Sequence, residues 1–142
     1  MKNIIYAIIG TAFVAILAIA IFTSNKMPNT DQKASVSDAV QKIVNLDPQS
    51  FKERIDADNP TIIDVRTEEE YRDGHIDNAL NLDFYANDFT DQLDKLDKDK
   101  AYSIYCRSGN RSGQTLHLMK NLGFKDVANL SGGFTAWEQN IN

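Results

Sequence analysis

Hydrophobic positions between residues 43 and 142 fall into short runs separated by longer amphipathic segments. The short runs, most of them with β-branched or aromatic residues, predict strands at residues 43–46, 61–66, 79–82, 101–106 and 126–130. The segments between them predict helices at residues 47–56, 67–74, 88–96, 111–123 and 132–140. We therefore expect an α/β fold with a central, mainly parallel five-stranded sheet and helices on both faces.

Local signals mark where several of these helices begin and end. Asp47 followed by Pro48 is a typical start, because Asp accepts a backbone hydrogen bond and Pro needs no N–H partner in the first turn. Thr67 and Glu70 have the spacing of a capping box. Gly123 stands where helices commonly end in a left-handed residue.

The first 25 residues have a different pattern. Residues 4–22 are apolar and uncharged, close to the roughly 20 residues that a helix needs to cross a bilayer. We expect residues 1–25 to be a transmembrane anchor or a signal segment, residues 26–42 a flexible linker and residues 43–142 the folded domain. An uncleaved anchor would be a single-pass helix in a bacterial inner membrane, with the domain on the periplasmic or extracytoplasmic side. Cleavage after residues 18–20, an A-x-A pattern with alanine at both ends, would instead release the domain to the periplasm.

Composition narrows the functions of the domain. The formal net charge of −5 argues against nucleic acid as a partner, because such binding depends on cationic side chains that neutralise phosphates. The single cysteine, Cys106, excludes an internal disulfide and a cysteine-based metal cluster. The two histidines, His75 and His117, are far apart in the sequence, so we expect neither a metal site nor a bound cofactor.

Cys106 stands at the carboxyl end of a predicted strand, just before a predicted helix, where parallel sheets place their ligand sites. The stretch that starts there reads C-R-S-G-N-R. Gly109 and Asn110 tolerate left-handed backbone, so successive N–H groups can turn inward and hold an anion. Arg107 and Arg111 add two guanidinium charges, and a thiol in this field should react as the thiolate. A buried structural cysteine is the alternative interpretation.

Three motifs, in this order and spacing, resemble the rhodanese family. They are IIDVRTEEEYRDGHIDNALNL at residues 62–82, YCRSGNRS at residues 105–112 and NLSGGFTAW at residues 129–137. The resemblance covers about residues 43–140 and implies a single rhodanese-like domain. One departure is at residues 77–78, where Asp-Asn replaces the family's usual Pro-Gly. We expect this change to affect the rigidity of a turn rather than the chemistry.

The resemblance implies a transferase of the thiosulfate sulfurtransferase (rhodanese) type. Cys106 would attack the sulfane sulfur of a thiosulfate-like donor, carry it as a persulfide and pass it to a thiol or to cyanide. Asp64 and Arg66 would lie near or beneath the loop and support it. Partners would be small sulfur-containing anions and thiol acceptors, with a protein sulfur acceptor as a further option. The substrate-binding residues that the resemblance implies are Arg107, Ser108, Gly109, Asn110 and Arg111.

Two other functions fit parts of the pattern. A persulfide relay or anion-binding module would use the same loop but act only with a protein partner. Phosphatases and arsenate reductases with a related loop have five residues between cysteine and arginine, whereas four separate Cys106 from Arg111. The extra residue widens the loop for a tetrahedral phosphate or arsenate, so the shorter loop favours a sulfur atom.

Overall fold

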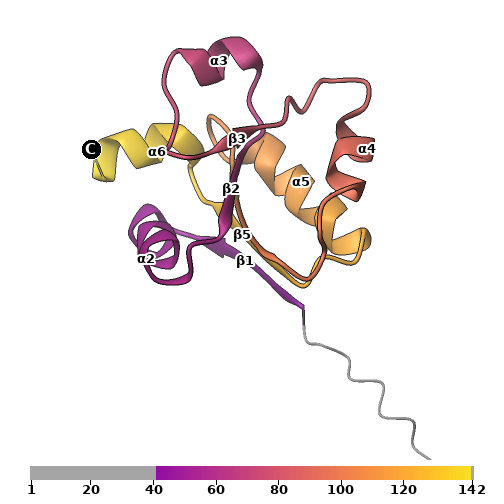
Figure 1. Cartoon of the computed structure of the whole chain (residues 1–142). Coiled ribbons are helices and arrows are strands. Elements are labelled where there is room, and N and C mark those ends of the chain that lie inside the picture. The colour runs from indigo at the N-terminus through magenta and orange to yellow at the C-terminus, as the bar shows by residue number, and fades with distance from the viewer. Residues whose placement is uncertain (1–40, 142) are drawn as a thin grey trace, which may run out of the picture. The chain divides into compact units, whose positions relative to one another are not determined.

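The structure of the protein, a computed structural model, describes residues 41–141 (Figure 1). Strands and helices alternate along this part of the chain. The strands are β1 (Lys42–Leu46), β2 (Thr61–Asp64), β3 (Leu80–Asn81), β4 (Ala101–Tyr105) and β5 (Asp126–Leu130). The helices are α2 (Pro48–Asp58), α3 (Glu68–Arg72), α4 (Phe89–Asp94), α5 (Asn110–Asn121) and α6 (Gly133–Asn140).

The strands form one sheet in the order β1-β5-β4-β2-β3, and every neighbouring pair is parallel. Figure 1 shows α2 and α6 on one side of this sheet and α4 and α5 on the other. Phe51 and Trp137 lie in the buried cluster on the first side, and Leu93, Leu116 and Met119 lie in the cluster on the second. The predicted α/β fold with a parallel five-stranded sheet is therefore confirmed.

The local signals at the helix ends are also confirmed. The Asp47 side chain accepts the N–H of Ser50 at 3.1 Å and caps α2, with Pro48 as the first helical residue. Both hydrogen bonds of the capping box between Thr67 and Glu70 are present at the start of α3. Gly123 follows α5 with a φ of +89°, the left-handed conformation that ends many helices.

Three strands are shorter than the sequence predicts. β2 stops at Asp64, although the N–H of Val65 still donates to the carbonyl of Tyr105 at 2.9 Å. The Asp64 carboxylate then accepts the N–H of Arg66 at 2.9 Å, which turns the chain away after Val65. β3 has two residues, since Ala79 is held in a turn by its N–H bond to the carbonyl of Ile76. β4 stops at Tyr105, so the next residue is already outside the sheet.

The segments predicted as a membrane anchor or signal and as most of the linker, residues 1–25 and 26–40, lie outside the described residues. β1 begins at Lys42, one residue before the predicted strand. Within residues 41–141, no helix combines the length and the hydropathy needed to cross a membrane.

The carboxyl ends of β2, β4 and β5 meet at one edge of the sheet, because the three strands are parallel neighbours. Asp64 at the end of β2 is paired in register with Tyr105 at the end of β4. This edge therefore brings together the segments that follow the three strands, at residues 65–67, 106–109 and 131–132.

Candidate active site

Cys106 is the first residue beyond β4, and the next residues turn sharply into α5. Gly109 has a φ of +92° and precedes the first residue of α5. A Cβ on Gly109 would lie 3.2 Å from the backbone nitrogen of Gly132, so the position needs glycine for its backbone angle and for its close contact. The turn brings the Gly109 N–H to 3.1 Å from Cys106 Sγ, and the Ser112 hydroxyl from the first turn of α5 is 3.4 Å away.

The surroundings of Cys106 act on its acidity in two directions. The residue is 1% exposed, and this burial raises the pKa of the thiol. The hydroxyl and N–H of Ser112 and the N–H groups of Ser108 and Gly109 lower the pKa, and the net shift is downward. The sulfur therefore lies at the floor of the loop, where the donors that favour a thiolate surround it.

Arg111 is bound by a carboxylate from α3. Its two terminal nitrogens lie 2.6 and 2.8 Å from the carboxylate oxygens of Glu70, a two-point contact between partly buried side chains. The hydrogen bond from Arg111 holds the pKa of Glu70 at about 2, well below its ordinary value of 4.5, and Glu70 in turn raises the pKa of Arg111. The ring of Tyr85 lies 5.7 Å from the Arg111 guanidinium carbon.

Arg107 has the opposite character. Its side chain is exposed and forms no ion pair with any carboxylate in residues 41–141. It lines a depression of about 180 Å³ beside the loop, together with Glu138 of α6 and Asp73 at the end of α3. Of the two arginines in the loop, Arg107 is thus the one without a carboxylate partner in the described part of the chain.

Asp64 and Arg66 form a buried ion pair next to this depression. Three hydrogen bonds of 2.7 to 3.0 Å join the Arg66 guanidinium to the Asp64 carboxylate. The same guanidinium donates to the carbonyl of Gly74 at 2.6 Å and lies 4.2 Å from the centre of the Phe134 ring. The pair therefore connects the end of β2 to the segment after α3 and to the start of α6, both of which border the loop.

The start of α6 contacts the loop through its backbone. The N–H of Phe134 donates to the carbonyl of Cys106 at 2.7 Å, and the N–H of Thr135 donates to the carbonyl of Arg107 at 3.0 Å. A turn of two glycines with positive φ, Gly132 and Gly133, precedes these donors. The carboxyl end of β5 thus supplies a third wall of the site.

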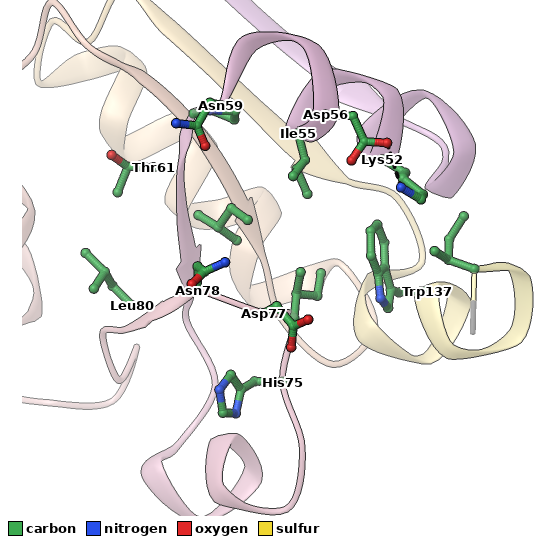
Figure 2. Close-up of a pocket in the computed structure, with 14 residues that line it drawn as sticks. Lys52, Ile55, Asp56, Asn59, Thr61, His75, Asp77, Asn78, Leu80 and Trp137 are labelled. Carbon is green, nitrogen blue, oxygen red and sulfur yellow. Dashed lines mark hydrogen bonds and ion pairs between the residues drawn. The ribbon is translucent and has the colours of Figure 1, made fainter.

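A larger depression lies elsewhere, away from the loop. It has a volume of about 740 Å³ and is formed by α2, α6 and the segment around residues 75–80. Figure 2 shows Lys52 and Asp56 of α2 and Trp137 of α6 on one side of it, and His75 and Asp77 on the other. Cys106 and its loop do not line this groove, so we place the candidate active site by its chemistry and not by cavity size.

A family model described as a rhodanese-like domain matches residues 47–140. The chain belongs to the rhodanese-like family. Among its relatives, the putative sulfurtransferase YtwF of Bacillus subtilis is 39% identical over 98 residues, which cover 68% of this chain and 92% of YtwF. A sulfurtransferase of Allochromatium vinosum is 34% identical over 93 residues, 65% of this chain and 85% of the relative. The putative sulfur carrier protein YrkF of B. subtilis is 30% identical and covers 71% of this chain and 54% of YrkF.

Solved structures of rhodanese-related proteins share the fold. A rhodanese-related protein of Thermoplasma volcanium superposes with a TM-score of 0.61 at 27% identity, over 68% of this chain and 92% of that protein. A rhodanese-like domain protein of Staphylococcus aureus has a TM-score of 0.58 at 31% identity, over 66% of this chain and 89% of that protein. The described part of the chain is therefore a rhodanese-like domain, as the three sequence motifs predicted.

The structure brings the predicted site residues to one edge of the sheet. The residues from Arg107 to Arg111 form the turn from Cys106 into α5, with the Gly109 N–H 3.1 Å from the sulfur and Arg111 bound to Glu70. Arg66, paired with Asp64, lines the same depression as Arg107. Sequence reasoning missed three further contributors: Glu70, Ser112 and the pair of glycines at the start of α6. The sequence indicated only a capping role for Glu70, because its contact with Arg111 depends on how α3 and α5 pack.

Proposed function

We propose that this protein is a sulfurtransferase in which Cys106 carries a sulfane sulfur as a persulfide. The Cys106 thiolate attacks the outer sulfur of a thiosulfate-like donor and forms a new S–S bond. The S–S bond of the donor breaks, and its electron pair leaves with sulfite. An acceptor thiolate, or cyanide, then attacks the outer sulfur of the persulfide, and the electron pair of the second broken S–S bond returns to Cys106. No external oxidant or reductant is consumed.

The observation that carries this proposal is the environment of the Cys106 sulfur. The Gly109 N–H and the Ser112 hydroxyl point at Sγ, and the donors around the sulfur lower the pKa of the thiol despite its burial. A thiolate is the nucleophilic form of cysteine, and the same donors would stabilise the anionic persulfide. Relatives named as sulfurtransferases support the same reaction class.

The two arginines take different parts in the proposed reaction. Arg107, which is exposed, would bind the anionic end of the donor and the departing sulfite. Arg111, held by Glu70, would keep the loop in shape from a fixed position. Ser108, Gly109 and Asn110 would contribute backbone N–H groups. Asp64 and Arg66 would support the loop without contacting the substrate.

Intact-protein mass spectrometry of the full chain tests the proposal. Incubation with thiosulfate should add the mass of one sulfur atom, and cyanide should remove it with formation of thiocyanate. Cys106→Ser should abolish both steps, since an alcohol cannot carry a sulfane sulfur. A wild-type protein that gains no sulfur from thiosulfate, mercaptopyruvate or a low-molecular-weight persulfide would refute the enzyme proposal. Phosphate esters and arsenate in the same panel test the phosphatase and reductase alternatives.

A persulfide relay that works only with a protein partner is the second candidate function. The 1% exposure of Cys106 favours it, because a sulfur at the floor of a loop is reached more selectively than one on the surface. The relative named as a putative sulfur carrier points the same way. Fast turnover with cyanide or glutathione as acceptor would favour an autonomous enzyme, and persulfide formation without such turnover would favour the relay.

We further propose that the domain is tethered to a bacterial inner membrane on its periplasmic or extracytoplasmic side. The apolar run of residues 4–22 supports this location. The alternative is release to the periplasm after cleavage of that run. Cell fractionation with N-terminal sequencing of the mature protein separates the two. Recovery of full-length protein in the cytosol would contradict both.

A further inference from the structure

The start of α6 lies directly against the loop that carries Cys106. The carbonyl oxygens of Cys106 and Arg107 accept the N–H groups of Phe134 and Thr135 at 2.7 and 3.0 Å. N–H groups in the first turn of a helix have no partner within the helix, so they are available to another segment. The loop therefore uses two donors that α6 cannot use itself.

These two bonds fix the orientation of two peptide groups in the loop. No peptide bond in residues 41–141 is cis, and in a trans peptide the N–H points opposite to the C=O. Because the Cys106 carbonyl is turned toward α6, the N–H of Arg107 points to the other side of the loop backbone. The Arg107 carbonyl is also turned toward α6, so the N–H of Ser108 points away from α6 as well. The next peptide carries the Gly109 N–H, which donates to Cys106 Sγ at 3.1 Å, and the Ser108 N–H also lowers the pKa of the thiol.

The close approach depends on the two glycines before these donors. Gly133 has a φ of +61°, and a Cβ there would lie 2.4 Å from the carbonyl oxygen of Cys106 and 2.6 Å from that of Arg107. Both distances are well inside van der Waals contact, so any side chain at residue 133 has to separate α6 from the loop. Gly132, the preceding residue, has a φ of +76° and begins the same left-handed turn.

We infer that the Gly132–Gly133 turn and the first N–H groups of α6 form a positioning element, which holds the two loop peptides next to the one whose Gly109 N–H donates to Cys106 Sγ. Gly133 is a positioning residue, because it acts through the two loop peptides and does not touch the sulfur. The inference rests on the proposed role of Cys106 as a nucleophile. It concerns the reactivity of the thiol and not the identity of the sulfur donor.

Gly133→Ala and Gly123→Ala in the full-length protein form a matched pair that tests the inference. Gly123 also has a positive φ, +89°, but a Cβ there meets nothing within 4 Å. Alanine at residue 123 therefore carries the cost of left-handed backbone without touching the loop. The readout is the rate at which iodoacetamide alkylates Cys106 as a function of pH, with thermal unfolding to verify folding.

We expect Gly133→Ala to move the pH profile of alkylation upward and to slow alkylation at neutral pH about tenfold, as for the loss of one hydrogen bond to an anion. Gly123→Ala should keep the wild-type profile even where it lowers the melting temperature. A folded Gly133→Ala protein with the wild-type profile would overturn the inference.

A second pair of variants tests the inference when Gly133→Ala fails to fold. Thr135→Pro removes the N–H that binds the Arg107 carbonyl, and proline is tolerated in the first turn of a helix. Thr135→Ala removes only an exposed side chain and keeps the N–H. Slower alkylation in the proline variant alone supports the inference, and equal rates in the two variants overturn it. A wild-type thiol that alkylates rapidly but accepts no sulfur would refute the proposed function and leave this inference standing.

Discussion

The loop that carries Cys106 is held from two sides by two different kinds of bond. On the α3 side, a guanidinium and a carboxylate from Arg111 and Glu70 meet in a two-point contact. On the α6 side, backbone N–H groups bind the carbonyls of Cys106 and Arg107. The first contact depends on charge and side-chain identity, and the second depends on how closely two backbones approach. The α3 side should therefore respond to pH and to charge changes, whereas the α6 side should respond to added volume.

The same comparison explains why the two loop arginines differ. The Arg111 guanidinium is paired with the Glu70 carboxylate of α3, which largely compensates its charge. Arg107 takes part in the α6 contact only through its backbone carbonyl, so its side chain stays exposed. One arginine side chain thus helps to hold the loop, and the other is exposed, which is why we propose Arg107 as the donor-binding residue.

Of the substitutions on the α3 side of the loop, Arg111→Met should lower the free energy of unfolding most. It leaves the Glu70 carboxylate, 23% exposed, without its main partner. We expect the free energy of unfolding to fall by about 3 kcal/mol, as for the removal of one partner from a partly desolvated pair. Chemical denaturation monitored by Trp137 fluorescence measures this change. Sulfur transfer should fall with it, because the α3 side of the loop is released.

The exposed pair between Arg72 and Glu68 provides the control for Arg111→Met. Both pairs join a glutamate of α3 to an arginine, but the Arg72 and Glu68 side chains are 71% and 68% exposed. Arg72→Met should change the free energy of unfolding by less than about 0.5 kcal/mol. Adding Glu70→Gln to Arg111→Met should recover part of the loss, since no unpaired carboxylate remains. Equal effects of Arg72→Met and Arg111→Met would show that the α3 contact does not hold the loop.

The α3 contact should also make stability depend on acid. The pKa of Glu70 is about 2 in the folded protein and 4.5 ordinarily, a depressed value. Its contribution is therefore fully present above about pH 4.5 and is lost as the pH falls toward 2. We expect the difference in unfolding free energy between wild type and Glu70→Gln to be about 2 kcal/mol at pH 6, and to shrink below pH 4.5.

Glu69→Gln is the matched control for this pH dependence. Glu69 lies in the same first turn of α3, is exposed and forms no ion pair within the described part of the chain. Its substitution should leave the acid dependence of unfolding as in the wild type. A difference between wild type and Glu70→Gln that stays constant from pH 6 to pH 2 would contradict the proposed linkage.

Arg107→Met should separate binding from stability. Removing an exposed guanidinium should raise KM for thiosulfate about tenfold, equivalent to about 1.4 kcal/mol, while unfolding changes by less than about 0.5 kcal/mol. Steady-state kinetics at low and high salt measure the effect. Lys120→Met removes an exposed cation from the far end of α5 and should leave KM unchanged. An unchanged KM in Arg107→Met would assign donor binding to other groups of the loop.

The fold could be predicted from the sequence because its signals are local. The capping box at Thr67 and the left-handed Gly123 report only on neighbouring residues, and each appears where it was expected. The bend after β2 was missed, because the hydrophobic pattern continues through Val65 while the Asp64 side chain already turns the chain. The length of a strand is thus decided by a hydrogen bond that the pattern does not contain.

The site could be predicted only for residues that are close in sequence. Cys106 and its loop form one continuous stretch, so their chemistry can be inferred from the order of residues. Glu70 and Arg111 are 41 positions apart, and no property of either residue indicates the other. Gly133 is similar: two consecutive glycines at the start of a helix indicate a tight turn, but only the packing of α6 shows which loop lies against it.

Tyr85→Leu should have the smallest effect on the free energy of unfolding. It tests whether the contact that holds Arg111 extends beyond Glu70 to the Tyr85 ring. The Tyr85 side chain is 67% exposed, and its ring lies 5.7 Å from the Arg111 guanidinium carbon. An exposed cation–π contact contributes about 0.5 to 1 kcal/mol, so we expect a loss of about 0.5 kcal/mol in urea unfolding. Leucine keeps an apolar side chain at the position, so the change isolates the interaction of the ring with the cation.

Leu80→Ala is the control, because Leu80 is the other large hydrophobic residue exposed in residues 41–141, at 53%. The Tyr85 effect should disappear in an Arg111→Met background, whereas the Leu80 effect should be the same in both backgrounds. A Tyr85 effect that persists without Arg111 would mean that the ring acts through its edge contact with Phe84, 5.4 Å between centres. The α3 side of the loop would then end at the ion pair itself.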